Sequence, residues 1–342
     1  MKHFYAASAK IHGMAKDLLK DEDFYRLSEC ERLEEFLVEV KKFPMGKELN
    51  VEDSPFQAEV KLQDYREKEL KKPLYFYNGP YRLFIKSFLD YKKMEEIKRI
   101  LRILQKKPGQ KVLMEEYLKE LNKYHLNSDA NIPAFIENLK GTKYYKVLKP
   151  YEDEEDNVIL FYMEMNLDRL YYQELMEIAK DFSKGNEKAV AELLGQKIDL
   201  LNIISIYRGL KYYQLLPEEL VNFVIRGGYR FHFDELQELC YSENEEDLIE
   251  KLSQSHYYFL FEGDRQEVYM DRRKSRYLHY LAKDIFRRSK FSFGKYIAYQ
   301  MLFEDNLKDL VTLMETTRFQ MEGWEKRKFL IRSYKGSDEN SR

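Results

Sequence analysis

The chain has few of the residues that punctuate β structure or carry redox and metal chemistry. Only 8 Pro and 14 Gly occur in 342 residues, and this scarcity favours long helices over short strands joined by turns. The 2 cysteines, Cys30 and Cys240, are far apart, and neither belongs to a CxxC pair that would indicate a metal or dithiol site. We interpret both as small buried hydrophobes in a reducing compartment.

Long apolar runs and an excess of one charge are also absent. The longest apolar runs, such as residues 158–163, fall far short of the roughly 18 residues that a membrane helix needs. The first residues lack the apolar stretch of a signal peptide. Lys and Arg total 58 against 60 for Asp and Glu, which argues against nucleic acid as the main partner, because phosphate binding requires a basic excess. We therefore expect a cytoplasmic protein that reaches a membrane only through a partner.

The familiar catalytic motifs are missing as well. No GxxxxGK[ST], HExxH or GxSxG occurs, and the 6 histidines are scattered. The paired carboxylates Glu154 and Glu155 lie in a run of like charge that is more typical of a solvated loop than of an acid–base site. We therefore predict no catalytic residue, no metal and no cofactor. An enzyme whose site assembles from distant residues is the alternative in this class.

Apolar residues recur instead at helical spacing. Steps of three and four residues place one group on a single helical stripe: Leu167, Leu170, Tyr171, Leu175, Ile178, Ala179 and Phe182. Strict alternation is rare, and the two aromatic-rich runs that could be strands, residues 158–163 and 257–261, border helical patterns. The chain is therefore predicted to be all-α, with a turn or linker at 106–109, an acidic loop at 152–156 and a disordered tail at 336–342.

Short segments repeat along the chain. Residues 36–40 (FLVEV) are echoed by residues 135–139 (FIENL) and by residues 248–252 (LIEKL). The interval of roughly a hundred residues is longer than that of ordinary solenoid repeats. It predicts three similar helical modules, at residues 1–110, 111–225 and 226–335.

A second set of matches links the later modules. Leu167-Asp168 recurs as Met270-Asp271, and each is followed at the same separation by Ala-Lys-Asp, at 179–181 and 282–284. Amphipathic modules bury one face internally and a second against a neighbour. Three such modules either close around a common axis or stack in an open array.

One stretch carries the strongest resemblance to a known family. Residues 197–209, KIDLLNIISIYRG, resemble the hydrophobic-Asp-x-x-Asn…Arg element of the C subunit of archaeal and bacterial V/A-type ATPases, whose eukaryotic counterpart is called the d subunit. Residues 164–172 are similar to its Glu-x-x-Leu-Asp-x-x-Tyr-Tyr helix start, and residues 291–299 to its Phe-Ser-x-Gly-x-x-x-Ala-Tyr element. The resemblance covers nearly the whole chain. The chain departs from the pattern at Lys290, where the family has proline.

The resemblance implies a fold and a role. Family members consist of three helical modules in a pseudo-threefold arrangement that forms a funnel. The funnel sits on the cytoplasmic face of the membrane proteolipid ring and receives the central stalk. The resemblance thus implies a non-catalytic peripheral rotor subunit, one copy per complex, that couples ATP hydrolysis or synthesis to proton or sodium transport. A helical-repeat scaffold that binds soluble protein partners is the alternative.

Five polar residues are the candidates for structural or stalk contacts: Asp168, Asp199, Asn202, Arg208 and Asp271. Asp199 and Asn202 are three residues apart and share a helix face. One interpretation is a polar lining that contacts the stalk. The other is a structural network of capping bonds, inter-helix hydrogen bonds and an Arg–carboxylate pair that holds the module together.

Charge is segregated in the C-terminal third of the chain. Acidic residues dominate positions 234–250, and basic residues dominate positions 272–295. These blocks are either two solvated faces that partly neutralise each other or surfaces that steer a charged partner.

Overall fold

The fold is built from helices. The computed structural model describes residues 2–105, 124, 131–152, 157–263 and 266–334, and no strand occurs within these residues. The all-α prediction is therefore confirmed for them. Residues 158–163 lie in a long helix, and residues 258–261 form a 3₁₀ turn. The predicted linker at 106–109, most of the acidic loop and the tail from 336 lie outside the described residues.

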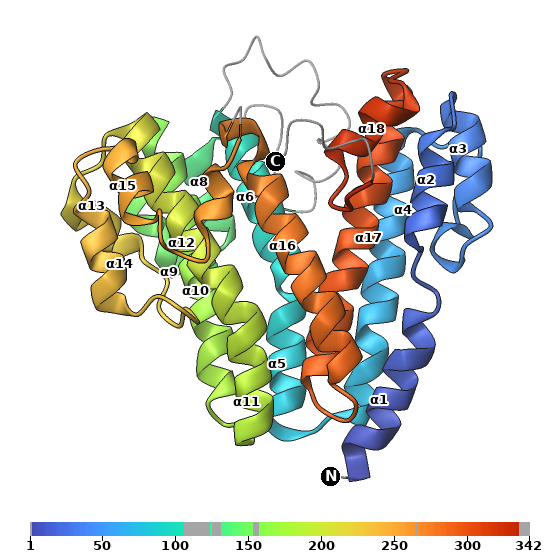
Figure 1. The fold of residues 1–342 in the computed structure, drawn as a ribbon, viewed down its shortest axis with the longest axis horizontal. Coiled ribbons are helices and arrows are strands. Elements are labelled where there is room, and N and C mark those ends of the chain that lie inside the picture. The colour runs from blue at the N-terminus through green and yellow to red at the C-terminus, as the bar shows by residue number, and fades with distance from the viewer. Residues whose placement is uncertain (1, 106–123, 125–130, 153–156, 264–265, 335–342) are drawn as a thin grey trace.

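The long helices form three pairs that run along the molecule and back (Figure 1). The first pair is α4 (Pro55–Lys71) with the nearly continuous α5 (Gly79–Leu89) and α6 (Tyr91–Gln105); the second is α10 (Asn157–Ala179) with α11 (Lys184–Val190) and α12 (Gln196–Arg208); the third is α16 (Gln266–Arg288) with α17 (Gly294–Arg318). Shorter helices gather around one end: α2 (Asp21–Ser28), α3 (Leu33–Val40), α8 (Ile132–Asn138), α9 (Lys143–Leu148), α13 (Pro217–Phe223), α14 (Phe233–Cys240), α15 (Glu245–Lys251) and α18 (Gly323–Phe329).

Neighbouring pairs pack against each other in sequence and then back to the start. Helix α10 of the second pair packs against α5 and α6, α12 packs against α16 of the third pair, and α17 packs against α4 of the first. We call each of these three interfaces a seam. The last seam brings the third pair back onto the first, so the long helices close around a common middle.

Each pair of long helices turns back at the lower end of Figure 1, and we call these three turns the returns. Aromatic rings from the three returns contact one another. The ring of Tyr81 stacks on Phe182 at 4.3 Å between centroids, and Phe293 lies 5.1 Å from each of them. Each ring comes from a different pair. The side chain of Asn186 donates to the Tyr81 hydroxyl at 2.9 Å and accepts from the backbone N–H of Phe293 at 2.9 Å. The three returns are thereby held together.

The two ends of the chain also meet. Helices α1 (Lys2–Ala15), α2 and α3 pack against α17, and α18 packs against α2. The buried ammonium of Lys326 donates to the carbonyl of Cys30 at 2.5 Å, and Arg327 donates to the hydroxyl of Ser28 at 2.7 Å. The N-terminal short helices therefore complete the C-terminal part of the fold. The module boundaries at 110, 225 and 335, and the pseudo-threefold funnel, stay predictions.

The sequence echoes fall in short helices. Segments 36–40, 135–139 and 248–252 fall within or at the ends of α3, α8 and α15. The first and last residue of each segment is buried, which explains why apolar residues recur there. The lone cysteines are buried too, with Cys30 3% and Cys240 0% exposed. Burial raises the pKa of the two thiols to about 11 and about 12, which confirms their interpretation as small hydrophobes.

Candidate functional site

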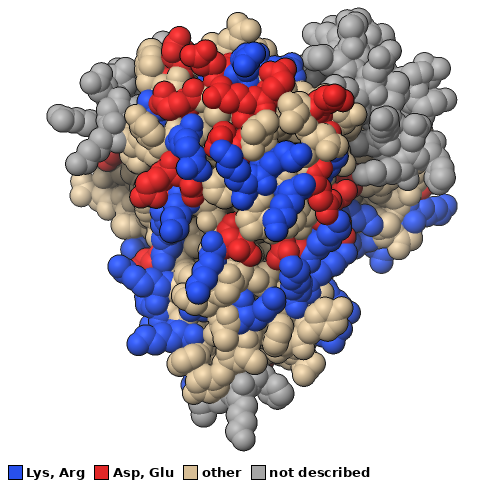
Figure 2. Space-filling model, turned by 90° about the vertical axis from the view of Figure 1, so that its right-hand side faces the viewer, with Lys and Arg blue, Asp and Glu red and all other residues tan. Residues whose placement is uncertain are grey.

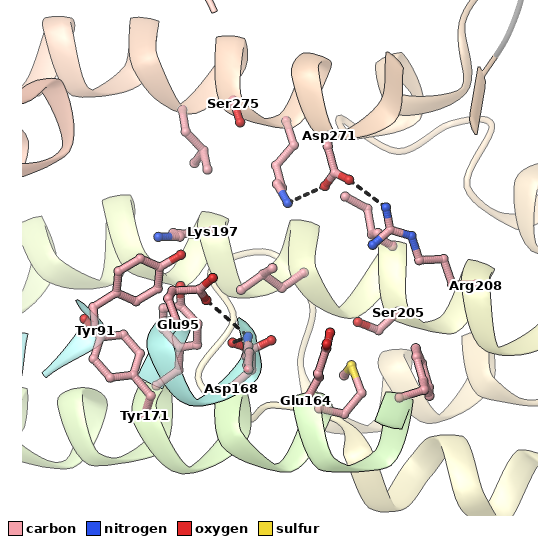
Figure 3. A pocket seen from close by; sticks show the side chains of 18 of the residues that line it. Tyr91, Glu95, Glu164, Asp168, Tyr171, Lys197, Ser205, Arg208, Asp271 and Ser275 are labelled. Carbon is pink, nitrogen blue, oxygen red and sulfur yellow. Dashed lines mark hydrogen bonds and ion pairs between the residues drawn. The ribbon is translucent and has the colours of Figure 1, made fainter. Parts of the chain in front are cut away.

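A cavity lies between the long helices. Its first lobe has a volume of about 730 Å³ and is lined by α6, α10, α12, α16 and α17 (Figure 3). A second lobe of about 690 Å³ adds α4 to the wall. The lobes share Tyr91, Glu95, Glu304 and Lys308, so they adjoin. Each of the three helix pairs therefore contributes both of its arms to the wall of one cavity.

Ion pairs cross every seam where it faces the cavity. Lys98 on α6 pairs with Asp168 on α10 at 2.5 Å. Arg208 on α12 pairs with Asp271 on α16 at 2.6 Å (Figure 3). At these two seams the cation lies on the earlier of the two helix pairs. At the seam that leads from the third pair back to the first, the anion Glu304 lies on α17 and the cation Arg66 on α4. The three contacts occupy corresponding places between successive pairs.

The electrostatics of these pairs follow from their burial. Burial lowers the pKa of Lys98, but the carboxylates of Asp168 and Glu95 outweigh burial and hold that pKa above its usual value. Burial alone would raise the pKa of Asp271, yet Lys274 and Arg208 lower it to about 2. Burial raises the pKa of Asp168, and Lys98 opposes that rise. The shifts of Lys98 and Asp271 thus favour the ionised form of both residues at neutral pH.

Asp199 lies on α12 and is not among the residues that line the two lobes of the cavity. It is 0% exposed and accepts hydrogen bonds from the backbone N–H groups of three consecutive residues and from the hydroxyl of Tyr257 at 2.8 Å. Burial raises the pKa of Asp199, and these donors oppose that rise. Gly228 makes the approach possible, since a Cβ there would lie 2.0 Å from a carboxylate oxygen of Asp199.

Asn202, three residues after Asp199 on α12, binds the backbone of Ile225. Its side-chain oxygen accepts from the N–H of Ile225 at 2.9 Å, and its amide donates to the carbonyl of that residue at 2.8 Å. On α17 of the third helix pair, Asp309 accepts from the N–H of Ile331 at 2.8 Å. Asn306 accepts from the N–H of Leu19 at 2.8 Å. Asn306 and Asp309 have the spacing of Asp199 and Asn202 with the two residue types exchanged. They too hold neighbouring backbone in place.

The structure thus divides the predicted residues into two groups. Asp168, Arg208 and Asp271 line the cavity, whereas Asp199 and Asn202 bind backbone groups of the segment that follows α13. Of the cations that line the cavity, the sequence patterns indicated Arg208 but not Lys98 or Arg102. Lys98 and Arg102, which binds Glu164 at 2.5 Å, are four residues apart on α6. Their shared helix face was the available signal.

The basic block on α16 has structural partners. Arg272 donates to the carbonyl of Lys328, Arg273 to that of Leu260 at 2.9 Å, and Arg276 to that of Ile331 at 3.0 Å. These guanidinium groups cap the backbone of adjoining segments.

Within the described residues, no group of three or more His, Cys, Asp or Glu side chains has an arrangement suited to a metal ion. None of the described helices combines the length and apolar character needed to cross a bilayer.

Comparison with known proteins identifies similar chains. The model of the family described as "ATP synthase (C/AC39) subunit" matches residues 7–325. The C subunit of the A-type ATP synthase of Methanosphaera stadtmanae is 26% identical over 196 residues, 55% of this chain and 51% of the relative. The corresponding C subunit of Methanosarcina mazei is 30% identical over 139 residues, 40% and 36% of the two chains. That of Pyrococcus abyssi is 26% identical over 233 residues, 65% and 60%. The chain thus spans about half the length of the curated relatives it matches.

Proposed function

The chain belongs to the ATP synthase (C/AC39) subunit family of A/V-type ATP synthases, and on this premise we propose that it is a non-catalytic subunit of the central rotor. It joins the central stalk to the proteolipid ring on the cytoplasmic face of the membrane, in one copy per complex. It couples ATP hydrolysis or synthesis, which take place on other subunits, to the transport of protons or sodium ions. It touches the membrane only through the ring.

The observation that carries this proposal is the cavity between the helix pairs. Its two lobes, of about 730 and 690 Å³, adjoin and are walled by helices from every pair. A shaft seated there contacts all three pairs at once. Because the seam between α17 and α4 closes the arrangement, a sideways push on one pair is passed to the next. This geometry suits a socket that transmits torque.

The lower end of the molecule suits a contact with the ring. The segments that connect the long helices there expose Tyr75 and Phe291, which are 86% and 55% exposed. Tyr5 on α1, 50% exposed, lies with its ring 4.4 Å from that of Phe291. On the face drawn in Figure 2, Lys and Arg persist toward this end while Asp and Glu become few. Exposed aromatic residues are favoured anchors in protein interfaces. We assign this end to the ring and the cavity to the stalk.

The two contacts can be tested separately by affinity capture from native membranes. Ser205 and Ser275 line the cavity, so Ser205→Trp/Ser275→Trp fills it, and we expect loss of the stalk with retention of the ring. Tyr75→Glu/Phe291→Glu places charge on the lower end, and we expect loss of the ring with retention of the stalk.

The matched control for the second variant is Leu216→Glu/Phe319→Glu, which alters two exposed apolar residues, 62% and 67% exposed, outside both surfaces. This control should recover both partners. Recovery of neither the stalk nor the ring by the wild-type chain would overturn the proposal. Recovery of soluble proteins alone would instead favour a general helical scaffold.

A further inference from the structure

The carboxylates that face the first lobe of the cavity are all engaged by partners within the protein. Glu95 and Asp168 pair with Lys98, Glu164 with Arg102, Asp271 with Arg208 and Lys274, Glu304 with Arg66, and Asp305 with His279. Each of these carboxylates therefore already has a direct partner, although Glu95 and Asp168 share Lys98, and Asp305 is neutralised only when His279 is protonated.

Two lysines of the same lobe differ from these groups. Among the described residues, no carboxylate lies within ion-pair distance of Lys197 on α12 or Lys308 on α17. Lys197 projects into the cavity (Figure 3), with its ammonium 5.0 Å from the ring centre of Tyr91 and 5.5 Å from that of Tyr172. Lys308 is exposed to the cavity. The wall therefore presents two ammonium groups that have no direct carboxylate partner among the described residues.

The lysines act together with a third ammonium. Lys274 on α16 lines the same lobe and shares Asp271 with Arg208. Burial, reinforced by the positive charges of Lys308 and Lys274, lowers the pKa of Lys197 to about 8. Glu304 and Asp305 on α17 act the opposite way. Ammonium groups from three helices thus lie near one another in this lobe.

The cavity has the size of a polypeptide segment. A helix about 11 Å wide with a rise of 5.4 Å per turn occupies roughly 500 Å³ per turn. The first lobe, at about 730 Å³, therefore accommodates somewhat more than one turn, and the adjoining lobe of about 690 Å³ accommodates a similar length. A small anion would leave most of this space to water.

We propose that the cavity receives the acidic end of a helical segment of the partner protein, whose carboxylates pair with Lys197 and Lys308. This inference rests on the proposed function, since it specifies the chemistry by which the stalk seats in the socket. The tyrosine rings beside Lys197 exclude water from its aliphatic stem, which strengthens the ion pair. The incoming carboxylate supplies the charge that the wall lacks.

The test measures binding of the purified central-stalk complex of the same enzyme to the full-length chain by calorimetry, over a series of salt concentrations. For Lys197→Met/Lys308→Met we expect a Kd raised about tenfold or more and a shallower dependence on salt. Lys10→Met/Lys146→Met, which removes two exposed lysines that do not line either lobe, should leave both quantities unchanged. Lys197→Arg/Lys308→Arg keeps the charge and should retain binding within about threefold.

The outcomes separate this inference from the proposed function. If Ser205→Trp/Ser275→Trp abolishes binding but Lys197→Met/Lys308→Met binds like wild type, the stalk enters the cavity without the proposed ion pairs, and the inference fails alone. If the filled cavity also binds normally, both ideas fail. Tight binding of inorganic phosphate that depends on the two lysines, without any effect of those lysines on the stalk, would mark a small-anion site and overturn the inference. Thermal unfolding of each variant identifies loss of fold.

Discussion

Single residues in this protein have distinct tasks, and Asp199 illustrates the structural one. Its carboxylate satisfies three successive backbone N–H groups, of Tyr229, Arg230 and Phe231, and the hydroxyl of Tyr257. The three N–H groups belong to the connection between α13 and α14, which is not helical. Removing the carboxylate leaves several buried donors without an acceptor, which costs more than the average hydrogen bond.

We therefore predict that Asp199→Ala lowers the free energy of unfolding by about 3 kcal/mol. Urea denaturation followed by circular dichroism measures this change. Asp181→Ala, at an exposed position, is the control and should stay within about 0.5 kcal/mol of wild type. In the assembled enzyme, Asp199→Ala should weaken assembly or coupling, while ATP hydrolysis by the detached head persists. Equal stability of both variants would contradict the structural role.

Lys197, in contrast to Asp199, lowers the stability of the folded protein at neutral pH. Its pKa falls from 10.5 to about 8, chiefly through burial, so between these pH values the unfolded chain binds more protons than the folded one. Stability contributed by this residue therefore rises with pH from about 8 to about 10.5 and is lost below that window. We predict that Lys197→Met raises the free energy of unfolding at pH 7 by about 1 kcal/mol.

Urea denaturation at two pH values checks this prediction. The gain from Lys197→Met should be present at pH 7 and should disappear near pH 10.5, where the lysine is largely neutral in the folded state and half neutral in the unfolded one. Lys10→Met supplies the control, because Lys10 is exposed on α1. A gain that persists unchanged at the higher pH would indicate better apolar packing rather than removal of a buried charge.

At the scale of helices, the seams differ in how much each ion pair stabilises them. Arg66 and Glu304 are 3% and 21% exposed at the α4–α17 seam, whereas Arg208 and Asp271 are 41% and 52% exposed at the α12–α16 seam. Breaking a buried pair leaves an uncompensated charge, but breaking an exposed pair changes little. Loss of its ion pair should therefore destabilise the α4–α17 seam more than the α12–α16 seam.

This difference predicts the outcome of a double-mutant cycle. Arg66→Met should cost about 3 kcal/mol, and Arg66→Met/Glu304→Met should recover most of that loss, because no buried charge remains. Arg208→Met, the matched change at the exposed seam, should cost less than about 1 kcal/mol. Chemical denaturation measures all three free energies. Additive losses in the double variant would argue against a direct pair between Arg66 and Glu304.

Sequence patterns foresaw part of this arrangement. Helical periodicity predicted α10, and the repeated Leu-Asp and Met-Asp steps marked Asp168 and Asp271, which both line the cavity. The partners of these residues could not be foreseen. Whether Lys98 meets Asp168 depends on how two helices lie side by side, and periodicity along one helix carries no information about its rotation against another. For the same reason, the sequence left both a partner surface and an internal network open for Asp199 and Asn202.

For the whole molecule, no sequence pattern indicated that the chain ends meet. Leu19 binds Asn306, and Lys326 binds the carbonyl of Cys30. These contacts join residues about three hundred positions apart, and no local pattern encodes such a distance. Helices α1–α3 belong to the predicted first module and pack on α17, and α1 also packs on residues 72–76. The boundary at residue 110 stays a prediction.

A truncation tests this closure. Removing the chain after Arg318 deletes α18 and Arg332, whose guanidinium pairs with the buried carboxylate of Asp309. We expect that amide hydrogen exchange in α2 accelerates by at least about a hundredfold, since α2 loses its packing against α18 and the ion pair of Asp21 with Arg332. Exchange in α10 and α12, which lie on the far side, should change little. Unchanged protection of α2 would show that it folds without the C-terminal segment.

The meeting of the chain ends also has a consequence during synthesis. Helices α1–α3 are translated well before the surfaces on α17 and α18 against which they pack. Until those surfaces are made, the apolar faces that α1–α3 bury there have no native covering and are open to aggregation. Nascent chains of this protein should therefore depend on chaperones for longer than chains whose first helices can pack as they emerge.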